Sequence, residues 1–578
     1  MARPAPRSDW TVPALRLGIV AFALTNGIIG YLLFRGYWAR GGVDWVEAAA
    51  GIAMFMGLTW LAWGAGVGLM GLFTLGRRPA IEPPPATGRT AVLVPIYNED
   101  PASTFARVAA MCTGLDRLGV ADRFDIAILS DTTSDAIALE EAGWFAQLAR
   151  HAEDGCRVFY RRREINHGRK AGNIEDFITR SGAAYDYAVI LDADSLVAAE
   201  TLVAMAARME ASPDVGLIQT VPQIVSGHSL FGRIVQFSAN YYSAAFAAGT
   251  AMLQGAEGPY WGHNAIVRMR AFAESCGLPV LSGKPPFGGA ILSHDYVEAA
   301  LLARMGWRVE LHPDLGGSFE EGPENLVEFA KRDRRWCQGN LQYLRLLIAP
   351  RLRLWSRVVF AQGIMSYMAS PLWFAFLALA AVAADRASGT FWLRPSNNGP
   401  ALLLTVQVIS LLLLPRLLIL LRGAFDGTNR LYGGTGRVMT SVLGEIVFTT
   451  ALAPIMLMVQ CRAIWQILTG RDGGWPSTQR GTSQLDSATA WRAVGWIVAF
   501  AAAATIVVIV SMPEAVAWLS PVLVPMLLSP FLVQWSSGPR GPKWLFQTPQ
   551  ERSMPHVDAD RHRVLNSWRT IVKPELAG

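Results

Sequence analysis

The sequence predicts a polytopic α-helical membrane protein that carries a soluble α/β domain with a mostly parallel sheet. The chain has 578 residues, of which 52% are hydrophobic. This is too apolar for an ordinary soluble enzyme, and the apolar excess lies at the two ends of the chain. Between them, strand-like runs alternate with amphipathic helical stretches, as in βαβ units around a parallel sheet. These observations place a soluble domain between two membrane-embedded regions.

Charge and cysteine content argue against several classes of function. The five cysteines are scattered and include no Cys-x-x-Cys pair, so neither a zinc site nor a disulfide framework is indicated. The net charge of +6 is modest, and no repeat of basic and aromatic residues favours nucleic acid as a partner. Arginines that flank apolar runs are instead expected on the cytoplasmic side of a membrane protein.

Residues 1–80 are expected to form two transmembrane helices. Val12–Phe34 is long enough to span a bilayer, which takes about 20 residues, and too long for the apolar core of a cleaved signal peptide. The second run, Ala48–Phe73, is followed by Gly76-Arg77-Arg78, which marks a cytoplasmic exit. The proline-rich stretch Ile81–Thr87 is typical of a stiff linker.

Residues 81–351 are expected to form the soluble domain, which faces the cytoplasm. No internal repeat is evident in it. The predicted strands are Thr90–Ile96, Phe124–Ser130, Arg157–Arg161, Tyr187–Asp192, Gly216–Thr220 and Trp307–His312. The predicted helices lie near Pro101–Leu118, Thr133–Ala152, Arg169–Arg180 and Ala199–Ala211.

Residues 352–535 are expected to form a second transmembrane region, and residues 536–578 a cytoplasmic tail with little structure of its own. The predicted spans are Val358–Ala384, Ala401–Leu421, Ala493–Val510 and Glu514–Val533. Segment 438–470 is too long for one plain span and too short for two, and arginines on both of its flanks place both in the cytoplasm. We therefore expect a re-entrant or interfacial element there and both chain termini inside. A single long tilted helix is the alternative.

The run Tyr187–Ser195 carries the first chemical signal. Its apolar strand ends in Asp192 and Asp194, which as residues i and i+2 face the same side. Ligands of open α/β sheets bind beyond the carboxyl ends of the strands. Two carboxylates there suit a hard divalent cation that also holds a substrate phosphate. The alternative is a strand followed by an Asp-rich turn.

Two other predicted strands also end in acidic residues. The first ends in Tyr97-Asn98-Glu99 and the second is followed by Asp131. Three acidic strand ends at one sheet edge would repel one another without compensation, so a metal and a basic group are expected nearby. Lys170, at a loop-to-helix junction, is a natural contact for a diphosphate. Taken alone, Lys170 is better explained as a solvated surface lysine.

Two later motifs add further polar groups. Ser293-His294-Asp295 lies at a predicted helix start, where Asp295 is either an N-terminal cap or a general base. Arg332–Asn340 lies just before the chain returns to the membrane. It is either a basic cluster on anionic lipid or it supplies Arg335 to a phosphate and Trp336 as a flat platform for a sugar ring.

Taken in order, these motifs resemble those of the processive family 2 glycosyltransferases, which include cellulose and hyaluronan synthases. Two longer strings, Ser293–Ala300 and Lys331–Leu341, are more similar to the glucans biosynthesis glucosyltransferase H family. Members of that family make osmoregulated periplasmic glucans in Gram-negative bacteria. Arg332 stands where cellulose synthases begin their Gln-x-x-Arg-Trp motif with Gln, and Ser293-His294-Asp295 replaces their Thr-Glu-Asp string. Both departures favour the glucan branch.

The resemblance implies a GT-A (Rossmann-like) domain that uses UDP-glucose with Mg²⁺ or Mn²⁺. It assigns catalysis to Asp295 as the base, the metal to Asp194 and Asp192, and the acceptor side to Trp336 and His294. The UDP-sugar-binding residues that it implies are Tyr97, Glu99, Asp131, Lys170, Asp192 and Arg335.

The implied activity is that of an inverting, processive, UDP-glucose-dependent hexosyltransferase of the bacterial inner membrane. It would extend a β-1,2-glucan backbone and pass it outward through the membrane region. The expected partners are the growing glucan chain, membrane lipid, acyl carrier protein and periplasmic glucan-processing proteins, with no nucleic acid. Segment 471–491, with Trp475–Arg480, lies where related synthases have a gating loop. No Arg-x-x-x-Arg element in the tail marks a cyclic-di-GMP-binding domain.

Two other interpretations stay open at this point. One is a family 2 enzyme with a different product, such as a cellulose-like or hyaluronan-like polysaccharide or a glycolipid. The other is a transporter with a nucleotide-sensing domain, in which Arg416 and Glu445 would be the intramembrane ionisable residues. No inverted repeat is visible to support a transporter.

Overall fold

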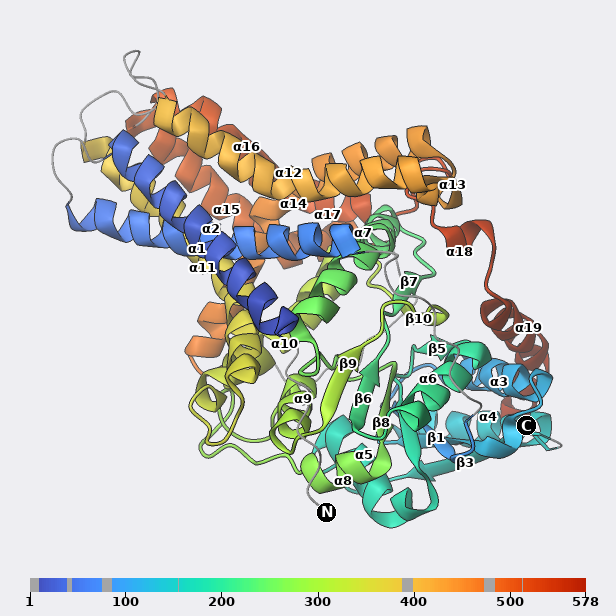
Figure 1. Ribbon diagram of the computed structural model, residues 1–578. Coiled ribbons are helices and arrows are strands. Elements are labelled where there is room, and N and C mark those ends of the chain that lie inside the picture. Colours follow the sequence, from blue (N-terminus) through green and yellow to red (C-terminus); the bar gives the residue numbers. More distant parts are fainter. Residues whose placement is uncertain are drawn as a thin grey trace.

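The computed structural model describes residues 10–38, 44–74, 86–153, 155–386, 399–471, 484–511 and 513–577. Long helices gather at one end of the molecule and an α/β domain forms the other (Figure 1). The predicted cytoplasmic exit at 76–78, most of the predicted linker, and the Trp475–Arg480 part of the predicted gating loop lie outside the described residues.

The α/β domain is built on a seven-stranded sheet with the order β3-β2-β1-β4-β8-β6-β9. Neighbours pair in parallel except at β8, which is antiparallel to both β4 and β6. The strands are β1 Thr90–Ile96, β2 Phe124–Ser130, β3 Arg157–Arg162, β4 Tyr187–Ile190, β6 Val215–Gln219, β8 Ala265–Arg268 and β9 Arg308–Leu311. The predicted mostly parallel sheet and its six predicted strands are confirmed, whereas β8 was not predicted.

The central strands are buried on both faces, which explains their nearly continuous apolar sequences. On β1, Val92 and Val94 belong to one core layer, and Ala91 and Leu93 belong to the other. The first layer includes side chains of helices α3 (Pro101–Arg117), α4 (Asp135–His151) and α6 (Ala199–Ala211). The second includes those of α5 (Arg169–Ser181), α8 (Met269–Ser275) and α9 (His294–Arg304).

A second, three-stranded sheet lies beside the turn that follows β4. Its order is β5-β10-β7, with β5 at Leu196–Val197, β7 at Gln223–Val225 and β10 at Ser318–Glu321. Strand β10 pairs antiparallel with β5 and parallel with β7. Because β5 directly follows the predicted Asp192–Asp194 motif, this small sheet brings a distant part of the chain next to that motif.

Two helices join the α/β domain to the membrane region. Helix α7 (Leu230–Gln254) packs on α2, and α10 (Leu326–Leu346) packs on α11 and α14. The α7–α2 contact is backbone to backbone, since a Cβ on Gly71 would lie 1.7 Å from the carbonyl oxygen of Ala245. Only glycine permits so close an approach. Neither α7 nor α10 was predicted from the sequence.

Six described helices are long and apolar enough to cross a membrane. They are α1 (Thr11–Trp38), α2 (Trp45–Thr74), α11 (Leu354–Arg386), α12 (Gly399–Asp426), α14 (Thr435–Leu468) and α15 (Ser487–Ser511). A further pair, Leu519–Leu527 and Ser529–Ser536, is bent by 66° and would count as a seventh if it formed one span. The short helices nearby are α13 (Thr428–Leu431), α16 (Val516–Leu527) and α17 (Ser529–Ser536), and the 3-10 turns of the chain are Ala121–Arg123, Gly182–Ala184 and Pro513–Ala515.

The backbone break expected at 438–468 is not found there, because α14 is one continuous helix. Its Pro454 is buried, and its neighbours Leu452 and Ile455 pack in a core shared with α15, so tertiary contacts hold the helix around the proline. The bent element is instead the α16–α17 pair, which contains Pro521, Pro525 and Pro530. Prolines remove backbone donors and promote such breaks.

The expectation of a tail with little structure is wrong. Residues after α17 form α18 (Pro549–Arg552) and the 22-residue α19 (His556–Ala577), which packs on α3 and α4 beside the α/β domain (Figure 1). Its side chains Val557, Val564 and Trp568 are buried in the core layer of α3 and α4. These residues recur at helical spacing and form one apolar stripe, a signal that the polar composition of the tail obscured.

Candidate active site

A cavity of about 670 Å³ lies beyond the carboxyl end of β4. Seven of the predicted site residues line it, namely Lys170, Asp192, Asp194, His294, Asp295, Arg335 and Trp336. Helices of the membrane region also contribute to its wall, with Trp60 from α2 and Gln362, Ser366 and Tyr367 from α11. The cavity therefore joins the acidic strand end to the apolar helices. The sequence did not predict which residues of those helices would line it.

The turn after β4 holds Asp192 next to a lysine. The Asp192 backbone N–H donates to Ser195 Oγ (2.9 Å), and the Ser195 N–H donates back to the Asp192 carbonyl (3.0 Å). Lys170 Nζ contacts the Asp192 carboxylate and donates to the carbonyl of Gly262 (2.7 Å). Lys170 is thus directed into the cavity and is not the solvated lysine of the alternative interpretation.

Asp194 shares its surroundings with two residues that the sequence analysis missed. Glu320 on β10 and His263 before β8 line the same cavity, and His263 Nε2 lies 3.4 Å from Glu320 Oε2. Burial raises the pKa of the Glu320 carboxyl, with the charges of Asp194 and Asp192 acting in the same direction. Several carboxylates therefore gather at this strand end, of which the sequence predicted Asp192 and Asp194 but not Glu320.

The donor set fits a hard divalent cation held jointly with a substrate. Among the described residues, no group of three or more His, Cys, Asp or Glu side chains could hold a metal ion alone. Mg²⁺ is commonly held by one or two carboxylates together with substrate phosphates and water. Asp192 and Asp194 supply such carboxylates, and Lys170 balances part of their charge.

Asp295 lies in the first turn of α9, where its carboxylate faces the cavity. The N-terminal cap position belongs to Ser293, so Asp295 is not the cap of this helix. Its Oδ1 is buried and has no hydrogen-bond partner among the described residues. Burial raises the pKa of the Asp295 carboxyl. A buried carboxylate oxygen with free acceptor capacity and increased basicity has the properties of a general base.

His294 beside it is held by a second carboxylate. His294 Nδ1 lies 3.0 Å from Glu298 Oε2, one helical turn further along α9. Burial acts against the charged imidazole, but the carboxylate of Glu298 outweighs it and raises the pKa of His294. This pair orients the ring at the cavity wall next to Asp295.

Helix α10 carries Arg335 and Trp336, the two residues predicted to contact a phosphate and a sugar ring. Both line the cavity. The Trp336 side chain is 44% exposed, and the guanidinium of Arg332 lies 4.6 Å from its ring centroid. This cation–π contact holds the indole in place while leaving part of it open to a ligand.

The same helix also fixes the loop that leads to Asp295. Gln342 Oε1 accepts from the Leu292 N–H (2.9 Å), and the Tyr343 hydroxyl donates to the Ser293 carbonyl (2.9 Å). Gly339 allows this approach, since a Cβ there would lie 2.2 Å from Ser293 Oγ. Gly339 belongs to the Arg332–Asn340 motif, but the sequence predicted no role for any of these three residues, because each acts on a loop that is distant along the chain.

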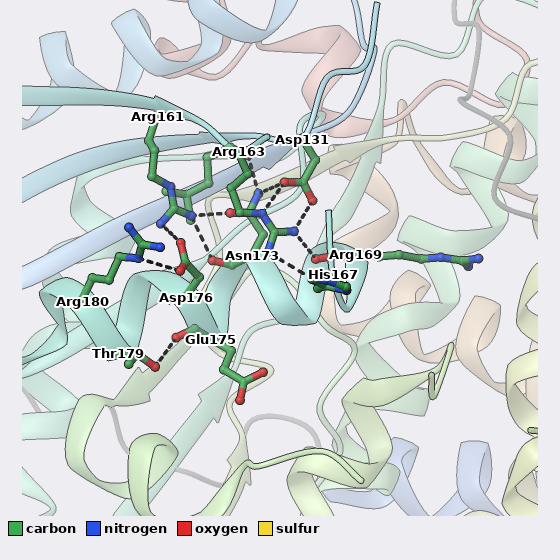
Figure 2. Close-up of polar contacts among 11 residues, drawn as sticks. Asp131, Arg161, Arg163, His167, Arg169, Asn173, Glu175, Asp176, Thr179 and Arg180 are labelled. Atoms are coloured by element: carbon green, nitrogen blue, oxygen red, sulfur yellow. Dashed lines mark hydrogen bonds and ion pairs between the residues drawn. The ribbon is translucent and has the colours of Figure 1, made fainter. Parts of the chain in front are cut away.

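Asp131 lies outside the cavity lining, at the end of β2, and is held by a network of donors (Figure 2). Arg163 makes two contacts with its carboxylate, both at 2.7 Å, and Asn173 Nδ2 donates to it at 2.9 Å. Asn173 also donates to the Leu129 carbonyl (2.9 Å), which ties α5 to β2. The predicted Lys170–Asn173 motif thus organises two strand ends at once.

Tyr97 and Glu99, at the end of β1, are likewise not among the cavity-lining residues. The Glu99 carboxylate accepts the Tyr97 backbone N–H and closes the turn on itself. Asn98 bridges this turn to β2 by accepting from the Ser134 N–H (3.1 Å). Of the three acidic strand ends predicted to converge, only the β4 end lines the cavity, and the other two form a polar cluster beside it.

Comparisons with known proteins agree with this architecture. The model of glycosyl transferase family 2 matches residues 91–275, and that of glycosyl transferase family group 2 matches residues 187–421. The chain is 47% identical to a glucans biosynthesis glucosyltransferase H of Cereibacter sphaeroides, over 99% of this chain and 98% of that protein.

Two further relatives carry the same name. The protein of Caulobacter vibrioides is 37% identical over 95% of this chain and 86% of its own length. That of Vibrio cholerae is 41% identical over 81% of this chain and 67% of its own length. These matches confirm the resemblance that the motifs indicated. The chain belongs to the glucans biosynthesis glucosyltransferase H family, a branch of the family 2 glycosyltransferases.

Proposed function

We propose that this chain is an inverting, processive glucosyltransferase that moves glucose from UDP-glucose onto a growing β-1,2-glucan. The observation that carries the proposal is the shared cavity, because Asp192, Asp194 and Asp295 line the same space as residues of α2 and α11. A donor site and an acceptor path toward the membrane can therefore meet at one point.

The donor would bind at the β4 strand end. Lys170 and Arg335 would neutralise the diphosphate, and the ordered cluster of Tyr97, Glu99 and Asp131 would support the nucleoside side. Mg²⁺ or Mn²⁺ on Asp194 and Asp192 would stabilise the charge of the departing diphosphate as a Lewis acid. The ion pair between Lys170 and Asp192 supports this arrangement, because a positive charge already lies against one of the two carboxylates.

Asp295 would act as the general base of a single displacement. Its carboxylate takes the proton of an acceptor hydroxyl while the hydroxyl oxygen bonds to the anomeric carbon of glucose. The bond from that carbon to the diphosphate oxygen breaks, and UDP leaves with the electron pair. One displacement inverts the configuration, so an α-linked donor yields a β-linked product. The raised pKa of Asp295 supports this role, because it makes the carboxylate a stronger base.

The acceptor would lie on the side of Trp336 and His294 and leave along the helices of the membrane region. Trp60 and Tyr367 supply further flat side chains of the kind that sugars stack on. We place the protein in the inner membrane of a Gram-negative bacterium with the α/β domain in the cytoplasm, where UDP-glucose is made. Periplasmic glucan-processing proteins would then receive the product, and acyl carrier protein is a further expected partner.

The test uses the full chain in phospholipid vesicles with Mg²⁺ and radiolabelled UDP-glucose. Methylation analysis of the product is expected to give a 1,2-linked glucan, and Asp295→Asn is expected to slow its synthesis by about 10²–10⁴-fold while the protein remains folded. A 1,4-linked product would contradict the proposed linkage and favour a cellulose-like enzyme. No turnover with any UDP-sugar would contradict the donor assignment itself.

A further inference from the structure

The backbone of the Asp192–Asp194 turn is held from behind by an arginine of α3. Arg107 Nη1 donates to the carbonyl of Ala193 (3.0 Å), the residue between the two aspartates. Arg107 is 4% exposed and Ala193 is 6% exposed, so water does not compete for this bond. Together with the two bonds between Asp192 and Ser195, this contact holds the backbone of the turn.

Arg107 is itself held by a carboxylate on β10. Its Nη2 lies 2.5 Å from Glu321 Oε1. The preceding residue, Glu320, lines the cavity. Successive residues of a strand point to opposite sides, so β10 directs one carboxylate into the cavity and the next one behind the turn.

Glu321 also receives an arginine from the far end of the chain. Arg561 on α19 places Nη1 3.2 Å from the same Glu321 Oε1, and its Nε lies 2.8 Å from Asp558 Oδ1. The Arg561 side chain is 8% exposed. The Glu321 carboxylate thus contacts two buried guanidinium groups. One is that of Arg107, which bonds to the Asp192–Asp194 turn, and the other is that of Arg561 on the last helix.

Helix α19 is packed against α3 and α4, which fixes the position of Arg561. Trp568 packs on Trp144 of α4 with ring centroids 6.2 Å apart, and Asp560 pairs with Arg117 of α3 at 2.6 Å. Val557 and Val564 complete its buried stripe. Fixing a charged side chain on such a packed helix costs less entropy than fixing it on a free tail.

The segment before α19 is tied to the membrane region along its length. The Gly538 carbonyl accepts from the Leu230 N–H (2.9 Å), and the Phe546 N–H donates to Ser441 Oγ on α14 (3.0 Å). Gln550 then bonds to Gln223 on β7 at 2.7 Å. Residues 537–569, the C-terminal strap, therefore connect α17 to the back of the Asp192–Asp194 turn.

We propose that the C-terminal strap positions the Asp192–Asp194 turn through Arg561, Glu321 and Arg107, which are positioning residues for binding of the metal and the nucleotide diphosphate. The role rests on the proposed function for the identity of that ligand. The physical reason is that a carboxylate pair must hold its geometry closely to share a cation with a substrate. Loss of partners that orient metal ligands typically weakens metal binding by about 10- to 100-fold.

The test compares two arginines of α19. Arg561→Gln removes the contact with Glu321, whereas Arg563→Gln is the matched control, because the Arg563 side chain is 72% exposed and pairs only locally with Asp560. Binding of Mn²⁺ in the presence of UDP is measured by electron paramagnetic resonance on the full chain in lipid nanodiscs. We expect about threefold weaker binding for Arg561→Gln, about tenfold weaker binding for Arg107→Gln, and no change for Arg563→Gln.

A second measurement, amide hydrogen exchange, needs no ligand. Amide hydrogen exchange of the peptide covering 187–196 is expected to accelerate in Arg561→Gln and Arg107→Gln, but not in Arg563→Gln. Arg561→Lys keeps the charge and is expected to restore most of the protection. Unchanged exchange and unchanged Mn²⁺ binding in Arg561→Gln would overturn the proposal, as would a fall in melting temperature without either change.

These measurements also separate the two proposals. If the wild-type chain fails to bind Mn²⁺ with UDP, the proposed donor is wrong, and hydrogen exchange still decides whether the strap positions the turn.

Discussion

The end of β2 and the end of β4 both present an aspartate at the same edge of the sheet, yet the two strand ends have different surroundings. The Asp131 carboxylate after β2 receives Arg163 at two positions and Asn173 at a third (Figure 2). Beyond β4, Asp192 and Asp194 line an open cavity, and Asp295 facing it has a buried oxygen without a hydrogen-bond partner among the described residues.

The difference distinguishes an aspartate that organises structure from one that is available for chemistry. A carboxylate with saturated hydrogen bonds resists change and keeps two elements in register. A buried carboxylate oxygen without a partner is costly to fold and is retained where a ligand completes it. The surrounding donors, and not the residue type, therefore decide the role of each aspartate.

The largest effect is expected from Asp295→Asn. It removes the proposed base and should lower kcat by about 10²–10⁴-fold, with binding of UDP retained. The measurement is the rate of glucan formation beside UDP affinity on the same preparation. A rate within a few-fold of wild type would show that the unpartnered oxygen has no catalytic role, and the comparison with Asp131 would lose its meaning.

The pH dependence of the same group sharpens this contrast. Burial raises the pKa of Asp295, so its folded form binds a proton more tightly than its unfolded form. As the pH falls, Asp295 therefore becomes protonated, and stops acting as a base, at a higher pH than an ordinary carboxylate would. The acid limb of the kcat/KM profile should follow this raised pKa. The same shift means that Asp295 favours folding below its ordinary pKa and that this contribution is lost as the pH rises through the folded value.

Asp295→Asn should stabilise the folded protein while it lowers activity. Asp295→Asn is expected to raise the melting temperature at neutral pH, where the buried charge is removed, and to change it little in acid. Thermal unfolding at both pH values checks this. A lower melting temperature at neutral pH would indicate that Asp295 has a structural partner.

Asp131→Ala is expected to act mainly on folding. It leaves Arg163, whose side chain is only 10% exposed, without its carboxylate. Breaking a buried pair in this way costs about 3 kcal/mol or more, so the α/β domain should unfold at a clearly lower denaturant concentration. The partner change Arg163→Gln is the control and should cost a similar amount. If Asp131→Ala folds normally and loses only UDP affinity, the saturated network is not structural.

Gly339→Ala tests whether the close approach of α10 to the loop before Asp295 is needed for activity. A Cβ at this position would meet Ser293 Oγ at 2.2 Å and its backbone nitrogen at 2.7 Å, so either α10 or the loop before Asp295 must move. A displacement of about 1 Å can lower a rate by about 10²-fold. We expect a reduced kcat with little change in the KM for UDP-glucose. Gly436→Ala is the matched control, because a Cβ added there would meet no atom within 4 Å beyond its own stretch of helix.

The smallest effect is expected from Lys170→Gln. Its ion pair with Asp192 is partly exposed, at 21% and 40% for the two side chains, so solvent screening limits its contribution to folding. The loss should appear as a higher KM for UDP-glucose, about tenfold in line with one charged hydrogen bond, at nearly constant melting temperature. An unchanged KM would exclude Lys170 from the donor site.

Several parts of this structure could be predicted from local sequence. The strands β1 and β2 begin and end as expected, because central parallel strands are apolar throughout and stop at polar residues. Strand β8 was missed because it is four residues long and pairs antiparallel between two strands. Helix α19 was missed because its apolar stripe is narrow and only its contact with α3 and α4 gives it a buried face.

The sequence by itself determined the chemical groups of this protein and their order. Asp192, Asp194, Asp295 and the Arg335-Trp336 pair could be identified because strand ends, helix starts and motif strings are local features of the chain. The family membership follows from the same local strings.

The tertiary structure alone decided which of these groups share a cavity and which are closed off. The network around Asp131, the contacts of α10 with the Asp295 loop, and the link from Arg561 to Arg107 through Glu321 join residues that are far apart in the chain. Such contacts depend on how packed layers meet in space. Many arrangements are compatible with the local sequence pattern, and close packing of the side chains selects one of them. The selection depends on which side chains are buried together, and the spacing of residues along the sequence does not show this.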